Sequence, residues 1–167
     1  GHWKTPDFSG IHMLVATIEE HKLLTMDAVE MAEALDVSSQ SLGAKDAKTM
    51  ATFIKNNGAL VSANLLNNDI GTEQAENLAT ILKEHATLKS LCGNKGDETE
   101  LDMSGKKMGA DGAIMLAPEI VANGALVKFD ISNNSLGGQY EERGSNRKWI
   151  SDMSGVKALA AAIPKCK

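Results

Sequence analysis

Apolar residues recur along this chain first at every second position and then at every third or fourth. Over residues 126–137 the alternation predicts a short strand, and a polar turn then leads to Leu136 and Gly137. The same string, apolar-x-apolar-x-x-polar-x-apolar-Gly, occurs four times. It ends at Gly43, Gly71, Gly109 and Gly137, so the first and last spacings are equal and the middle one is ten positions longer. A constant period with one ten-residue insertion predicts tandem repeats.

A helical stripe follows each of the four strings. Its apolar residues stand at positions i, i+3, i+4 and i+7, which form one face of a helix. Small and large residues recur at the same places, so each helix is expected to sit close to its strand and to fill the space between layers. The four predicted stripes are Ala47, Met50, Ala51 and Ile54; Ala75, Leu78, Ala79 and Leu82; Ala113, Leu116, Ala117 and Ile120; and Val156, Leu159, Ala160 and Ile163.

Strand and helix motifs together carry a family resemblance. The pattern L-x-x-L-x-L-x-x-N-x-L-G, followed by a G-A-x-x-L-A-x-x-L helix, resembles the leucine-rich repeat family, and the 28-residue period resembles its ribonuclease-inhibitor-like class. The resemblance covers about residues 35–167. It implies an α/β solenoid, a right-handed superhelix in a horseshoe arc, with a parallel sheet on the concave face and helices on the convex face. The family's asparagine position holds Gln40, Asn68, Lys106 and Asn134, so the ladder of buried amides is expected to be incomplete.

The repeats define the expected organisation of the chain. Residues 1–33 form a leader, read either as a capping segment with a helix at about residues 10–24 or as a partly disordered tail. The units then span residues 34–60, 61–88, 89–126 with the ten-residue insertion, and 127–167 with a long loop at about 138–152. Residues 88–93 begin a strand that no helix follows, so this half-repeat predicts five parallel strands.

Composition narrows the expected partners. The chain has 167 residues, a net charge of −5 and only 4% aromatic residues. An acidic balance argues against a nucleic-acid or anionic-membrane surface, both of which require a basic face, and favours a protein with a basic surface. The sequence has no signal-peptide pattern and no apolar run long enough to span a bilayer, so we expect no membrane partner and a cytoplasmic location.

Candidate catalytic groups are scattered. Cys92 and Cys166 lie 74 positions apart, the four histidines form no cluster, and no phosphate-binding glycine motif occurs. We therefore expect a protein that is not an enzyme and that holds no metal or cofactor, with thiols that are buried or incidental.

Strand geometry predicts one candidate binding surface. Successive side chains of a strand face opposite ways and parallel strands stack about 4.8 Å apart, so Asp36, Asp102 and Asp130 are expected in one acidic column. A basic segment of a partner would fit this strip, and the alternative is a merely solvated sheet face. The outward-facing residues proposed to bind are Asp36, Asn64, Leu66, Glu100, Asp102, Lys128 and Asp130.

The added loop is the second candidate surface. It contains Tyr140, Arg143, Arg147 and Trp149, and Tyr, Trp and Arg are the residue types that most often carry binding energy at interfaces. In the alternative interpretation, Trp149 folds back over the helices and only stabilises the loop.

The sequence thus predicts a protein-interaction module or scaffold. Two alternatives remain: a regulator of a small GTPase, suggested by resemblance to the Ran GTPase-activating proteins of the same repeat class, and a fragment of a larger repeat protein with its activity elsewhere. The last predicted helix has no polar capping unit after it, so self-association through this end is a third expectation.

Overall fold

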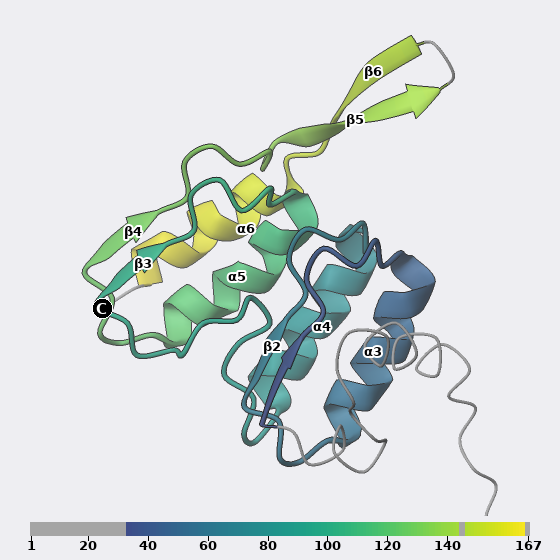
Figure 1. Ribbon diagram of the computed structural model, residues 1–167. Coiled ribbons are helices and arrows are strands. Elements are labelled where there is room, and N and C mark those ends of the chain that lie inside the picture. Colours follow the sequence, from purple (N-terminus) through teal and green to yellow (C-terminus); the bar gives the residue numbers. More distant parts are fainter. Residues whose placement is uncertain (1–32, 144–145, 166–167) are drawn as a thin grey trace, which may run out of the picture.

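The computed structural model describes residues 33–143 and 146–165 as a mixed α/β chain (Figure 1). The expected leader helix at residues 10–24 and Cys166 lie outside the described residues. None of the described helices is both long and apolar enough to cross a membrane. The elements in chain order are β1 Ala34–Asp36, α3 Ala44–Asn56, β2 Ser62–Asn64, α4 Thr72–Glu84, β3 Glu100–Asp102, α5 Ala110–Ala122, β4 Lys128–Asp130, β5 Gly138–Arg143, β6 Asn146–Ser151, α6 Ser154–Ala162 and the 3-10 helix η1 Ile163–Lys165.

The helices pack in chain order, α3 on α4, α4 on α5 and α5 on α6. All predicted stripe residues of α3, α4 and α5 are buried, which confirms the helical period. In α6 the predicted stripe is confirmed only at Leu159: Gly155 and Ala162 are the other buried residues, and Ile163 is 52% exposed. A Cβ atom on Gly155 would lie 2.7 Å from the Ala110 Cα atom, so the close approach of α6 to α5 turns this glycine inward.

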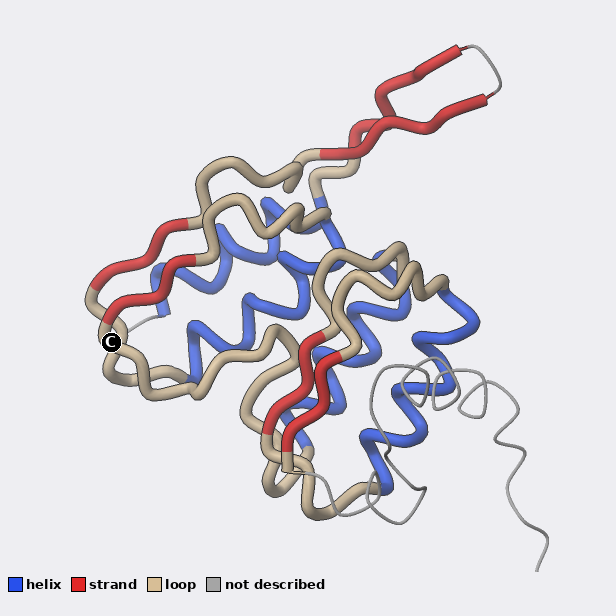
Figure 2. Tube along the Cα trace, viewed as in Figure 1, coloured by secondary structure: helices blue, strands red, loops and turns tan. Residues whose placement is uncertain are grey.

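The strands form two separate parallel pairs, β1 with β2 and β3 with β4 (Figure 2). The expectation of one sheet of five parallel strands is therefore wrong for the described residues. Residues 88–93, which we call the edge segment, do pair with the free side of β2, through a parallel bridge between Ser62 and Ser90 and an antiparallel bridge between Asn64 and Cys92. The half-repeat thus ends the first pair and does not connect it to the second.

The second strand pair repeats the first at a constant offset along the chain. Ala34 pairs with Ser62, and Glu100 pairs with Lys128, 66 positions later in each case. We call this spacing the module offset. The hydrogen bonds follow it: Val61 N donates to Glu33 O and Val127 N to Thr99 O, both at 2.7 Å. The ten-residue insertion therefore separates two similar two-strand modules, each built from two repeat units.

One asparagine ties the two units of each module together. The Asn68 Oδ1 atom accepts the N–H groups of Gln40 and Leu42, both at 3.0 Å, and its Nδ2 atom donates to Val37 O and Leu65 O. Asn134 makes the corresponding bonds in the second module, where its Oδ1 atom accepts the Met108 N–H and its Nδ2 atom donates to Met103 O and Ile131 O. Each ladder asparagine therefore satisfies groups of the unit before it. Gln40 and Lys106 hold the same position in the first unit of each module, and within the described residues neither makes the hydrogen bonds to a preceding unit that Asn68 and Asn134 make.

The segment expected to be a long loop is an antiparallel hairpin, so this prediction is wrong. β5 and β6 pair over their whole length, and the hairpin projects from the body of the molecule (Figure 1). Gly138 opens it with φ +148°, and a Cβ atom there would overlap the carbonyl oxygen of Ile150. Only glycine fits at this crossing of the two strands.

We expect Asn68→Ala to destabilise the fold by about 1–3 kcal/mol, because it leaves backbone N–H and C=O groups in the turn without partners. Urea unfolding measures the loss. Gln40→Ala, at the same position of the preceding unit, is the matched control and should change the free energy of unfolding by less than about 0.5 kcal/mol. Equal losses in the two variants would show that the ladder asparagine has no special role.

Candidate functional site

The outward side chains of the two strand pairs form one candidate surface, which we call the strand face. In each strand the middle residue is the most buried and its neighbours are more exposed, as the alternation predicts. Because the pairs are separate, the single column of Asp36, Asp102 and Asp130 is wrong: Asp36 pairs with Asn64, and Asp102 pairs with Asp130. The strand face consists of Asp36, Asn64, Glu100, Asp102, Lys128 and Asp130.

Each aspartate of the strand face also shapes its own turn. The Oδ1 atoms of Asp36, Asp102 and Asp130 accept the N–H group two residues later, at 2.9, 2.9 and 2.8 Å. The hydrogen bond from the Ser104 side chain is the main cause that lowers the pKa of Asp102, and the Ser104 N–H and nearby Lys106 and Lys128 add to it. Asp102 is therefore ionised at neutral pH, and at least one oxygen of each aspartate is engaged in structure.

Lysine partly offsets the acidic charge of the strand face. The Lys128 Nζ atom lies 3.1 Å from the Glu100 Oε2 atom, with the two side chains 71% and 68% exposed. An ion pair this open to water stabilises little and leaves both groups able to exchange partners. In the first module, the Asn64 Nδ2 atom donates to the Asp36 Oδ2 atom at 3.3 Å.

Leu66 does not belong to the strand face, because it is only 6% exposed. The prediction extended the alternation one step beyond β2, but Asn67 has φ +56° and the chain turns there. A Cβ atom on Gly112 would lie 3.2 Å from the Leu66 Cδ2 atom, so Leu66 lies against α5. Serine occupies the corresponding position of the other units, at Ser38, Ser104 and Ser132. The leucine of this unit therefore adds an apolar contact between the two modules.

The hairpin holds the four residues of the second predicted surface. Tyr140 and Arg143 stand on β5, Arg147 and Trp149 stand on β6, and Tyr140 and Trp149 are cross-strand partners. The Trp149 side chain is 43% exposed. The structure thus brings these residues together in one projecting element, apart from the strand face.

A buried carboxylate, missed by the sequence reasoning, joins the two modules. Glu119 of α5 is 4% exposed and accepts hydrogen bonds from the edge segment and the residue that follows it. Its Oε1 atom accepts the N–H groups of Leu91 and Cys92 at 2.7 and 3.0 Å, and its Oε2 atom accepts from Ser90 Oγ and Asn94 Nδ2, both at 2.8 Å. Burial raises the pKa of Glu119, and these hydrogen bonds act in the opposite direction.

A sequence signal for Glu119 did exist. Counted from the first stripe residue of each helix, its position holds Phe53 in α3 and Ile81 in α4, and both pack against the core. A glutamate at a position that is apolar in the other helices indicates a specific polar partner, because an unpaired buried charge is costly.

Cys92 and His85 are the cysteine and the histidine within the described residues. Cys92 is buried, and desolvation raises the pKa of its thiol well above the ordinary value, with Glu119 adding to the effect. The His85 Nδ1 atom accepts the N–H groups of Thr87 and Leu88 at 3.3 and 3.0 Å. Among the described residues, no group of three or more His, Cys, Asp or Glu side chains is placed to hold a metal ion.

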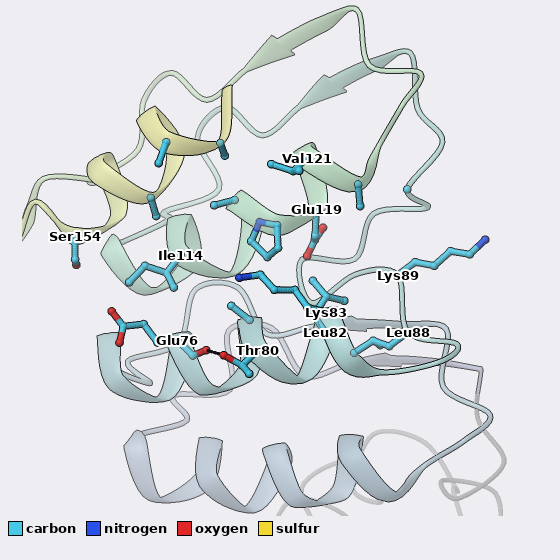
Figure 3. Close-up of a pocket in the computed structure, with 18 of the residues that line it drawn as sticks. Glu76, Thr80, Leu82, Lys83, Leu88, Lys89, Ile114, Glu119, Val121 and Ser154 are labelled. Carbon is cyan, nitrogen blue, oxygen red and sulfur yellow. Dashed lines mark hydrogen bonds between the residues drawn. The ribbon is translucent and has the colours of Figure 1, made fainter. Parts of the chain in front are cut away.

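A groove of about 1130 Å³ lies on the helix side, between α4, α5 and α6. Its lining is mostly Ala, Leu, Ile and Val, and it also includes charged residues. Figure 3 shows Lys83 lying along the groove, whereas Lys89 points outward. This surface was also missed: the stripe residues Ala79, Leu82 and Ala117 help to line it, but a stripe does not tell how closely neighbouring helices pack.

The chain matches no protein-family model. A search of curated proteins finds no significant match either.

We expect the burial of Glu119 to make stability fall as pH rises. A carboxyl group whose folded pKa is raised keeps its proton to higher pH when folded than when unfolded, so the free energy of unfolding declines from about pH 4.3, the ordinary glutamate value, through the raised pKa. Glu119→Gln removes this contribution, so the wild-type free energy of unfolding minus that of the variant should decrease between pH 4 and 7.

Denaturant unfolding of both proteins across this pH range measures the effect. Glu84→Gln, at an exposed position of α4, controls for the substitution itself. A difference between wild type and Glu119→Gln that stays constant or grows with pH would contradict the prediction.

Proposed function

We propose that the chain is a leucine-rich-repeat module of the ribonuclease-inhibitor-like class and that it binds a partner protein with a basic surface. The observation that carries the proposed binding is the charge of the second strand pair, where Glu100, Asp102 and Asp130 all face outward. The partner would lie across the strand face, and the hairpin would supply a second contact.

The repeat assignment rests on pattern and geometry together. Strand, turn and helix recur in phase, and the two modules share strand pairing and turn hydrogen bonds at the module offset. Asn68 and Asn134 occupy the family's asparagine position and bond the turns of neighbouring units. A continuous superhelix formed by these units is part of the proposal.

The chemistry of the strand face favours ionic recognition. Asp102 and Asp130 are partners on adjacent strands, so two carboxylates lie side by side on an open surface. Two like charges in register disfavour each other, and a cationic side chain of a partner between them would relieve that repulsion. An acidic surface also accelerates association with a basic partner at low ionic strength.

The hairpin suits a second contact because it stands clear of the helices and strands (Figure 1). Its sequence combines two aromatic residues with both signs of charge, which is the composition of many interface centres. The partly exposed ring of Trp149 has apolar area left to bury.

We expect the double substitution Asp102→Lys with Asp130→Lys to abolish capture of the partner in a pull-down at low salt concentration. It replaces two carboxylates, which would attract a basic partner, with two ammonium groups, which would repel it. Wild-type capture should weaken as the salt concentration rises. Glu73→Lys with Glu84→Lys makes the same change of net charge on exposed positions of α4 and should leave capture intact. Equal loss in both variants would show that net charge alone governs binding, and salt-independent capture would exclude the strand face as the interface.

We expect Trp149→Ala to weaken partner binding about tenfold while changing the melting temperature by less than about 2 °C, because the indole is partly exposed on a projecting element. Titration calorimetry with the captured partner and a thermal melt measure the two effects. Trp149→Phe, which keeps an aromatic ring, should retain most of the affinity. If Trp149→Ala lowers the melting temperature and leaves affinity unchanged, the tryptophan has only a structural role.

A further inference from the structure

The outer edge of β2 shows how this fold receives an additional strand. Four backbone hydrogen bonds join β2 and the two residues that flank it to the edge segment. Lys89 N donates to Val61 O at 2.7 Å, Ala63 N to Ser90 O at 2.8 Å, Leu65 N to Leu91 O at 2.9 Å and Gly93 N to Ala63 O at 2.9 Å. The edge segment runs parallel to β2 at its start and leaves little of Leu88 and Leu91 exposed.

The same four positions recur on β4 at the module offset. They are Val127 O, Phe129 N, Phe129 O and Ile131 N. β4 bonds to β3 through its other side, since Lys128 N donates to Thr99 O and Asp130 O accepts the Met103 N–H. No hydrogen bond from another described residue reaches these four groups, so β4 is an open sheet edge within the part of the chain described.

Side-chain burial marks the same edge as incomplete. Ala63 and Leu65, beneath the edge segment, are 0% and 1% exposed. Their counterparts Phe129 and Ile131 are only partly buried, and Val127 is 86% exposed. Apolar exposure of this kind beside unpaired strand groups is the usual setting for strand addition.

We propose that the outer edge of β4 binds an extended peptide segment of a partner protein, which adds a parallel strand as the edge segment does on β2. This site lies along the sheet edge, so it goes beyond the proposed use of the strand face and hairpin. The four backbone groups of β4 supply the pairing, and Phe129 and Ile131 supply apolar contact.

The charges beside the edge define the peptide. On β2 the bridging pairs are Ser62 with Ser90 and Asn64 with Cys92. At the module offset, Ser62 and Asn64 correspond to Lys128 and Asp130. The peptide should therefore carry an acidic residue at the position of Ser90, beside Lys128, and a basic residue at the position of Cys92, beside Asp130. Leucine belongs at the positions of Leu88 and Leu91.

The edge segment itself supplies the probe. The test peptide is a fluorescently labelled copy of residues 86–94 carrying Ser90→Glu and Cys92→Lys, and the matched control carries Ser90→Lys and Cys92→Glu. Anisotropy titrations with the full chain should show about tenfold weaker binding of the control, because two favourable cross-strand charge pairs become unfavourable. A third peptide adds Lys89→Pro and Gly93→Pro to the test peptide. It lacks the two donors to the edge and should not bind.

A chain variant reverses the charges at the site. Lys128→Asp with Asp130→Lys changes the two charged residues of β4 and should make the control peptide the tighter binder. Amide NMR shifts on adding the test peptide to the wild-type chain should be largest at Phe129 and Ile131.

Three outcomes would overturn the proposal: equal binding of the two charged peptides, full binding of the proline peptide, or shifts that avoid β4. Dilution of the chain without peptide tests whether a second copy of this chain occupies the edge of β4. If dilution alone moves the Phe129 and Ile131 amides and sedimentation shows a dimer, the edge pairs with a second copy of this chain and not with a partner peptide.

Discussion

The carboxylate of Glu119 connects α5 to the edge segment, and with the packing of α4 on α5 it joins the two modules. Removing a carboxylate from water costs several kcal/mol, and hydrogen bonds to a charged group contribute about 1.5–3 kcal/mol each. Four donors on two oxygens therefore offset part of this cost, but none of them is a lysine or arginine, and desolvation still raises the pKa of Glu119. Without these bonds, the Leu91 N–H would lose its acceptor at the point where the first strand pair ends, and the Cys92 N–H would keep only the Ser90 Oγ atom.

Glu119 performs at this boundary the function that asparagine performs within each module. Asn68 and Asn134 both donate and accept, because the turns they hold expose carbonyl groups as well as N–H groups. The edge segment presents only donors to α5, so an acceptor with two oxygens suits it better than an amide. The difference in side-chain chemistry follows from the difference in what the backbone leaves unpaired.

Sequence periodicity predicted the helices well because the spacing of a stripe follows from the geometry of the helix alone. Ala47 and Ile54 must share a face in any helix, whatever packs against it. The relation between strand pairs was not predictable in the same way, since it depends on long-range contacts that no local period encodes: the packing of α4 on α5, the contact of Leu66 with α5 and the hydrogen bonds of Glu119. The hairpin was missed because its strands are mostly polar: Glu141 and Glu142 of β5 are in register with Lys148 and Arg147 of β6, and neither strand shows the apolar alternation of a half-buried strand.

The candidate sites differ in how far sequence could locate them. The outward position of Asp102 and Asp130 followed from strand alternation, which holds for every half-buried strand. The edge of β4 could not be found this way, because the groups that would bind there are backbone N–H and C=O groups, which almost every sequence has.

Comparison within the molecule identifies that edge. The helix row runs without interruption from α3 to α6, but on the strand side the edge segment and the residues up to Thr99 stand between β2 and β3. The Glu98 carboxylate holds this connection by accepting the N–H groups of Lys95 and Gly96 at 2.6 and 2.9 Å. The first module therefore meets its neighbour through a covered sheet edge, and the same edge in the second module, built from the same backbone positions, is left uncovered by the described residues.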